Sequence, residues 1–193
     1  GVDNWKMRTG NLSDEEFSKI GDALGEMDEI PIYIDDTSSM TIVELRNKAR
    51  RAMHDHDIGI VIVDYLQLIQ GSDRYKGNRV QEVTEISRGL KILARELEIP
   101  VIALAQLSRS VTGRDDPRPV LSDLRESGSI EQDADLVMFL HRPDYYKQND
   151  DNYEETHITE LLVAKHRHGA VGKIELYFHP ELLRFMSLDK TRE

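Results

Sequence analysis

The pattern that most constrains the fold is a pair of buried-strand segments with an amphipathic helix between them. IGIVIV at 58–63 is apolar and mostly β-branched, which is typical of a strand covered on both faces of a parallel sheet. VIALAQ at 101–106 has the same character, and apolar residues recur at helical spacing from Val80 to Leu97. A strand, a helix and a strand in this order predict an α/β fold around a mostly parallel sheet flanked by helices.

Local signals extend this pattern along the rest of the chain. Two capping boxes predict helices over about 14–25 and 42–55: Ser13 with Glu16, and Thr41 with Glu44. Short apolar runs predict further strands over 31–34, 136–140, 158–164 and 173–178. RFMSL near the end predicts a closing antiparallel hairpin, whereas the polar tract YYKQNDDNYEET predicts an exposed, mobile loop.

Composition excludes several classes of protein. No apolar run approaches the roughly 20 residues that a membrane-spanning helix needs, so a membrane protein is not expected. The absence of cysteine excludes disulfides and thiolate chemistry, which suits a reducing cytoplasm. The net charge of −11 argues against a nucleic-acid binder, but residues 65–127 carry 10 Lys and Arg against 9 Asp and Glu. The acidity therefore lies outside the middle third of the chain.

Polar residues at the ends of the expected strands are the candidates for chemistry, because ligands of parallel sheets bind beyond the carboxyl ends of the strands. Asp64 follows a buried strand in the manner of a Walker B carboxylate, which holds the Mg²⁺ of a nucleoside triphosphate. Gln106 ends the next strand, where a neutral amide can bind a terminal phosphate. Lys165 and Arg167 share one face of an extended segment and suit a triphosphate. Each pattern also fits a strand that simply ends in polar turn residues.

Two other patterns are weaker evidence for a binding site. GAVGKI at 169–174 contains Gly-Lys, but it lacks the spacing and the Ser or Thr of a phosphate-binding P-loop, and no other segment qualifies. His166 and His168 converge on one face of a strand, but without a cysteine or a third ligand nearby they make a weak metal site.

Several long blocks resemble, in the correct order, motifs of the C-terminal motor domain of bacterial replicative DNA helicases, the DnaB family. They are IDDTSS, VIVDYLQLI, EISRGLKILARELEIPVIALAQLSRSV, SDLRESGSIEQDADLV and AKHRHGAVGKIEL. The resemblance covers nearly the whole chain and implies a RecA-like P-loop NTPase core. It implies a homo-hexameric ring that uses ATP and Mg²⁺ to unwind DNA at the replication fork while translocating on single-stranded DNA, with primase and a helicase loader as partners.

The resemblance also implies roles for individual residues. Asp64 would position Mg²⁺, and Gln106 would couple the γ-phosphate to the DNA-binding loops. Lys165 and Arg167 would reach the ATP site of the adjacent subunit, with Arg167 as an arginine finger.

The block SDLRESGS implies contacts with DNA phosphates from Arg125, Glu126 and Gly128. Arg125 would supply charge, Gly128 would let backbone amides approach a phosphate, and Glu126 would orient its neighbours.

The departures from the family are equally specific. A family motor has a P-loop, a strand with a catalytic glutamate and an N-terminal collar domain, all of which would precede Gly1. We therefore expect residues 1–193 to form a single, N-terminally truncated motor domain that does not hydrolyse ATP alone.

Three alternatives stay open on the sequence. Asp35, Asp36, Asp64 and Lys165 resemble the acidic pocket and lysine of a response-regulator phospho-acceptor domain, although about 100 residues separate the last two. A RecA-like recombination or repair ATPase, and a non-catalytic ring subunit, are the others.

Overall fold

The computed structural model describes residues 1–107, 113–114, 116–124, 128–147 and 153–188. The chain forms two compact units. The central unit comprises Thr37–Phe139 and Val163–Gly172, and the terminal unit comprises Gly1–Asp36, Leu140–Leu162 and Lys173–Glu193.

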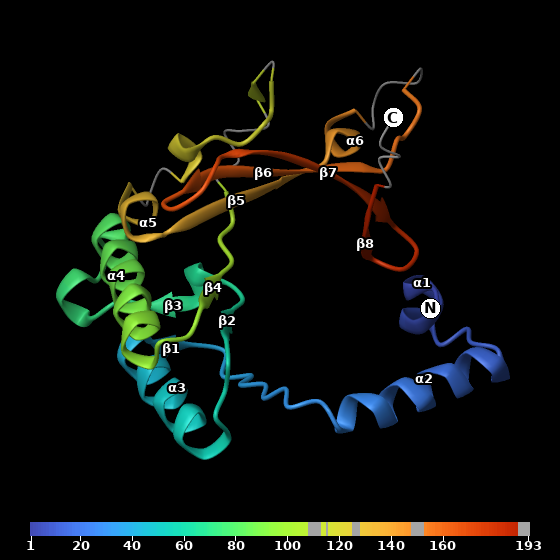
Figure 1. Cartoon of the computed structure of the whole chain (residues 1–193), viewed down its shortest axis with the longest axis horizontal. Coiled ribbons are helices and arrows are strands. Elements are labelled where there is room, and N and C mark those ends of the chain that lie inside the picture. The colour runs from blue at the N-terminus through green and yellow to red at the C-terminus, as the bar shows by residue number, and fades with distance from the viewer. Residues whose placement is uncertain (108–112, 115, 125–127, 148–152, 189–193) are drawn as a thin grey trace. The chain divides into compact units, whose positions relative to one another are not determined.

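The central unit contains short parallel strands and two long helices. Its elements, in chain order, are β1 (Met40–Thr41), α3 (Ile42–His56), β2 (Val61–Val63), β3 (Ile69–Gln70), α4 (Arg79–Leu97), β4 (Val101–Ala103) and α5 (Gly128–Asp133). β1 pairs with β3 and β2 pairs with β4, both in parallel, with Val63 opposite Ala103. Helices α3 and α4 lie side by side (Figure 1).

The core of the central unit lies where α3 and α4 pack on each other and on the segment around β2 and β3. Its buried apolar residues are Ile42, Leu45, Ala49, Val63, Leu66, Ile69, Val83, Ile86, Leu90 and Leu93. Ile86 and Leu93 have no exposed surface, and burying a side chain of this size stabilises a fold by about 1.5–3 kcal/mol. Through this core, α3 and α4 pack against the segment that contains β2 and β3.

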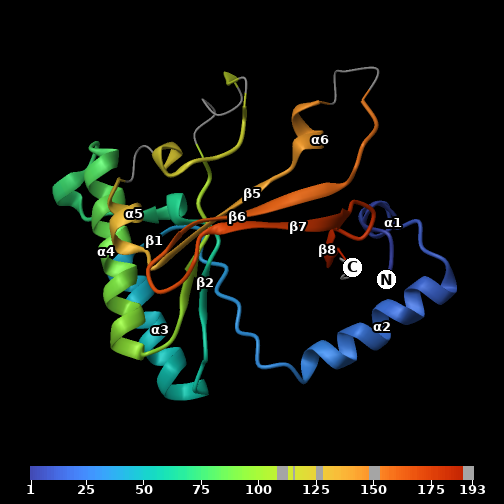
Figure 2. The same cartoon turned by 45° about the horizontal axis from the view of Figure 1, so that its top comes forward.

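The remaining strands form one four-stranded sheet in the order β5, β6, β7, β8, whose closing hairpin can be followed in Figure 2. The strands span Leu136–His141, Ile158–His166, Gly172–His179 and Arg184–Ser187. β7 and β8 are antiparallel, with Phe178 opposite Phe185. Along β5 every second residue is buried, so one face of this strand is covered. The helices of the terminal unit are α1 (Asn4–Thr9), α2 (Asp14–Asp28) and α6 (Pro143–Tyr146).

The predicted helices are confirmed, because their signals are local. Both capping boxes form: Ser13 with Glu16 at the start of α2, and Thr41 with Glu44 at the start of α3. The β6, β7 and β8 strands and the hairpin are confirmed as well, as are the α/β class and the parallel pairing. No helix in the described ranges is long and apolar enough to cross a bilayer.

Two sequence expectations are wrong, and a third holds only in part. Residues 31–34 form no strand, and Ile32, Tyr33 and Ile34 are exposed, because no strand of the described chain lies beside them to pair. β2 and β4 have three residues each, and the exposed fractions of Ile62 and Ile102 are 63% and 45%, so neither strand is covered on both faces. The tract after Asp144 is mostly exposed, as expected, but it begins in helix α6 and its Tyr153 hydroxyl donates to the wholly buried Asp144. Residues 148–152 of this tract lie outside the described residues.

Candidate functional site

The candidate site lies where β2 and β4 end. Because these neighbouring strands are parallel, their carboxyl ends share one edge of the sheet. The two segments stay together beyond the strands: the Leu104 amide donates to the Val63 carbonyl at 3.0 Å, and the Leu66 amide donates to the Leu104 carbonyl at 2.8 Å. The residues after each strand are therefore held next to each other.

Asp64 and Gln106 line the same surface depression, of about 450 Å³, as expected from their places after neighbouring strands. Both residues are exposed. Tyr65, Leu104 and Ala105 complete the lining, and the peptide bond between Asp64 and Tyr65 is cis. A carboxylate is a ligand that Mg²⁺ prefers, and an amide can donate a hydrogen bond to a phosphate oxygen. The chemistry of this donor set fits the metal and phosphate ends of a nucleotide.

Gln67 belongs to this site, although no sequence motif singles it out. Its side-chain Nε2 donates to the backbone carbonyl of Gln106 at 2.9 Å, and its Oε1 accepts from the backbone amide of Gln106 at 3.3 Å. The only sequence signal is that a polar residue interrupts the apolar run after Asp64.

Lys165 and Arg167 both turn toward the end of α5, as their spacing predicts for neighbours on one face. The Lys165 ammonium donates to the carbonyls of Glu131 and Ala134, the latter at 2.8 Å. Arg167 donates to the Gln132 carbonyl at 3.3 Å. Among the described residues, no hydrogen bond or ion pair joins these cations to the depression that contains the Walker B candidate.

Asp135 is the carboxylate partner of Arg167, at 2.8 Å, and it also pairs with Lys91 of α4. The hydrogen bond from Lys91 and the nearby charge of Arg167 hold the pKa of Asp135 below its ordinary value, against the opposing effect of burial. Asp135 is therefore negatively charged at neutral pH and forms an ion pair with Arg167.

Of the three DNA-contact candidates, Arg125 and Glu126 lie outside the described residues. Gly128 is the first residue of α5, and among the described residues outside its own helix no atom lies within 4 Å of the position that a Cβ would take.

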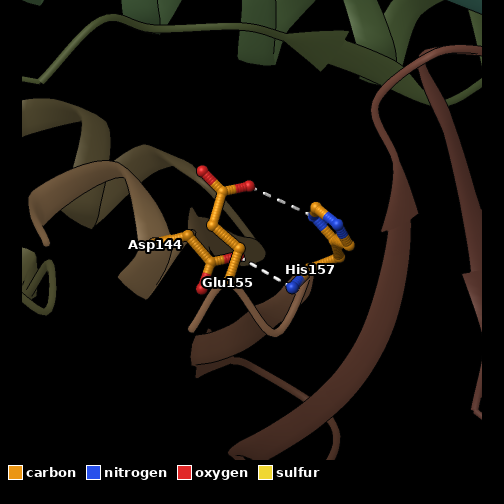
Figure 3. Close-up of side chains that lie close together, drawn as sticks. All are labelled: Asp144, Glu155 and His157. Atoms are coloured by element: carbon orange, nitrogen blue, oxygen red, sulfur yellow. Dashed lines mark hydrogen bonds and ion pairs between the residues drawn. The ribbon is translucent and has the colours of Figure 1, made fainter. Parts of the chain in front are cut away.

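A second polar cluster surrounds Asp144, and Figure 3 shows it with Glu155 and His157. Among the described residues it is the one group of acidic and histidine side chains with metal-binding geometry. The Asp144 carboxylate, however, already accepts hydrogen bonds from the Tyr153 hydroxyl, the Thr156 amide and hydroxyl, and the His157 amide. Burial raises the pKa of Asp144, but these bonds outweigh it and the pKa lies below its ordinary value. The group closes the loop after α6.

The residues of the response-regulator alternative do not form one cluster in a single unit. Asp35 and Asp36 lie in a segment of the terminal unit without regular structure, whereas Asp64 and Lys165 belong to the central unit. The Lys165 ammonium is bound to backbone carbonyls.

Comparison with known proteins places these features in a family. Residues 1–187 match the family described as DnaB-like helicase C terminal domain. The replicative DNA helicase DnaB of Geobacillus stearothermophilus is 53% identical over 184 residues, and the replicative DNA helicase DnaC of Bacillus subtilis (strain 168) is 52% identical over 184 residues. Each alignment covers 95% of this chain and 40% of the relative, so the chain spans about two fifths of these relatives.

Solved structures agree with the fold. One of them, an ATPase domain, superposes with a TM-score of 0.88 at 40% identity, over 97% of this chain and 66% of that chain. A DnaB-like replicative helicase, studied with its interactions with primase, gives the same TM-score and identity over 97% of this chain and 45% of that chain. The predicted resemblance to the DnaB-like helicase family and the predicted fold are confirmed.

Proposed function

Because the chain belongs to the DnaB-like helicase C-terminal domain family, we propose that it is part of the motor of a replicative DNA helicase. The enzyme would use ATP to unwind duplex DNA at the replication fork. The observation that carries this proposal is the shared depression of Asp64 and Gln106 at the carboxyl edge of the β2–β4 pair. It supplies a carboxylate and an amide where a nucleotide of this fold class binds.

Asp64 would hold Mg²⁺, usually through a water, and Gln106 would donate its amide to a terminal phosphate oxygen. Bound Mg²⁺ supplies positive charge that stabilises the transferring phosphoryl group. The role of this chain is then to fix the positions of the two polar groups. A phosphate that leaves would release the Gln106 amide, which provides a signal for the next step of the cycle.

Lys165 and Arg167 would act on the ATP site of the adjacent subunit in a homo-hexameric ring. Their partners in this chain are carbonyls and one carboxylate, all of which a phosphate can replace. Arg167 is the proposed finger, and a finger supplied in trans accelerates phosphoryl transfer by roughly 10³ to 10⁵.

The whole helicase would encircle single-stranded DNA through Arg125, Glu126 and Gly128. Primase and a loader are its proposed partners, and the solved relative with its primase interactions supports the first of these. We place the protein in the cytoplasm. That residues 1–193 form one motor domain, inactive as an ATPase alone because the sequence has no P-loop, stays a prediction.

The proposal is tested with Asp64→Ala in the full-length helicase. Loss of the Mg²⁺ ligand should lower the rate of ATP hydrolysis by about 100-fold or more, since electrostatic stabilisation of the transferring phosphate is lost. The matched control is Asp55→Ala, an exposed aspartate on α3, which should keep the wild-type rate. Phosphate release is the measurement. Equal rates for the two variants would contradict the role of Asp64.

A further inference from the structure

The backbone of Gln106 is held by a side chain from the segment that carries Asp64. We propose that Gln67 is a positioning residue: by holding the backbone of Gln106, it fixes the position from which the side-chain amide of Gln106 meets the nucleotide. The inference rests on the proposed role of Gln106 and adds the device that sets its position.

Gln67 satisfies both backbone groups of Gln106. The backbone hydrogen bonds between the two segments end with the Leu66 amide on the Leu104 carbonyl, so the Gln106 backbone lies beyond them. There the Gln67 side chain continues the pattern, donating to the Gln106 carbonyl at 2.9 Å and accepting from its amide at 3.3 Å. A side-chain amide that pairs in this way replaces the missing strand neighbour and holds the residue in one orientation.

Gln67 is itself held in place by buried residues that lie before and after it in the sequence. Leu66 directly precedes Gln67 and Ile69 lies two residues after it, and these two side chains are only 3% and 4% exposed and belong to the core. Asp64 lies three residues before Gln67, on the same short stretch. Asp64, the proposed metal ligand, and Gln67 therefore lie on one short segment that is anchored to the core. A shift of one of them would move the other as well.

A second set of contacts ties Gln67 to the start of α4. The Arg79 guanidinium donates to the Gln67 carbonyl at 3.1 Å and pairs with Glu82 at 3.2 Å. Glu82 also accepts from the Gly77 amide at 3.2 Å. The turn before α4 is thereby connected, through Arg79 and Gln67, to the backbone of Gln106.

The first experiment uses Gln67→Met in the full-length helicase, because methionine keeps the length of the side chain and removes both hydrogen bonds. We expect kcat for ATP to fall about tenfold, roughly the effect of losing two hydrogen bonds that stabilise the reactive arrangement, while KM for ATP changes by less than about twofold. Gln81→Met, an exposed glutamine on α4, is the matched control and should keep both constants. Thermal unfolding and ring assembly are followed to exclude loss of the fold.

The second experiment separates positioning from a merely structural role. The Gln106→Ala variant keeps the backbone groups of residue 106 and removes its side-chain amide. In this background Gln67→Met should cause little further loss of kcat. Hydrogen exchange of the Gln106 backbone amide should be faster in Gln67→Met than in the wild type.

The outcomes are distinct. Equal losses of kcat from Gln67→Met in both backgrounds, or unchanged exchange at residue 106, would overturn the inference. An unchanged kcat in Gln106→Ala alone would instead contradict the proposed function of Gln106, while the exchange rate still reports on the contact.

Discussion

At the scale of single residues, Gly89 determines how closely α4 approaches α3. A Cβ at this position would overlap Cγ1 of Ile42 and lie 3.0 Å from its Cδ1. Ile42 is 5% exposed and cannot move into solvent. Gly89→Ala should therefore destabilise the protein by about 1–3 kcal/mol, although alanine is the better helix former.

Urea unfolding of the helicase measures this effect. Gly25→Ala is the control, because that helical glycine of α2 has open space around it and the change should be neutral or stabilising by up to about 1 kcal/mol. The cost of Gly89→Ala should shrink in an Ile42→Ala background, where the overlapping atom is gone. A cost that stays the same in both backgrounds would mean that the overlap is not its cause.

Single residues also show where sequence reasoning succeeds and fails at the site. The positions of Asp64 and Gln106 could be predicted, because the ends of parallel strands meet at one edge. Gln67 could not, because its contact with Gln106 spans 39 positions of sequence and depends on how the two strand ends are placed. The cluster around Asp144 could not be predicted for a different reason: its partners lie 9 to 13 residues away, in a tract whose polarity alone indicates an exposed loop.

At the scale of elements, an ion pair between helices adds to the apolar contact of α3 with α4. Glu96 of α4 pairs with Arg50 and with Arg46 of α3, the latter at 3.0 Å. The hydrogen bonds from Arg50 and then Arg46 lower the pKa of Glu96 from 4.5 to about 2. A carboxyl whose pKa is depressed by folding stabilises the fold above its unfolded pKa and stops doing so as the pH falls through the folded one.

Glu96→Gln should therefore lower Tm at pH 7, and the difference from the wild type should narrow as the pH falls from about 4.5 toward about 2. Thermal unfolding at a series of pH values is the measurement. Glu26→Gln, an exposed residue of α2 with no ion pair within the described ranges, serves as the control. A difference in Tm that does not change with pH would show that Glu96 acts through packing and not through its charge.

The elements differ in how well the sequence predicts them. α2 and α3 begin where their capping boxes place them, because each box joins residues three apart. The apolar run at 31–34 has the composition of a strand, but a strand exists only beside a partner, and the described chain offers none there. β2 is shorter than its apolar run for a related reason, since its pairing with β4 covers only Val61–Val63.

At the scale of the whole molecule, the uneven distribution of charge makes a net charge of −11 compatible with the proposed DNA binding. The middle third is close to neutral and contains Arg125. If Arg125 contacts a phosphate, Arg125→Ala should weaken single-strand binding by the intact ring for all sequences. The slope of log affinity against log salt should also fall by about one unit.

Fluorescence anisotropy with labelled oligonucleotides at several salt concentrations measures both quantities. Arg51→Ala, an exposed arginine on α3, is the matched control for the change in net charge. The same slope in Arg125→Ala and the wild type would remove Arg125 from the DNA contacts.

The contact of Arg167 with Asp135 has a consequence for any assembly of this chain. The guanidinium already has a carboxylate at 2.8 Å, and that carboxylate is shared with Lys91. The Arg167 side chain is 43% exposed and a guanidinium has five N–H donors, so an anion from another molecule can bind it beside Asp135 or in place of Asp135. Because Asp135 already offsets the positive charge, a densely charged group such as a polyphosphate gains more from this contact than a singly charged anion does.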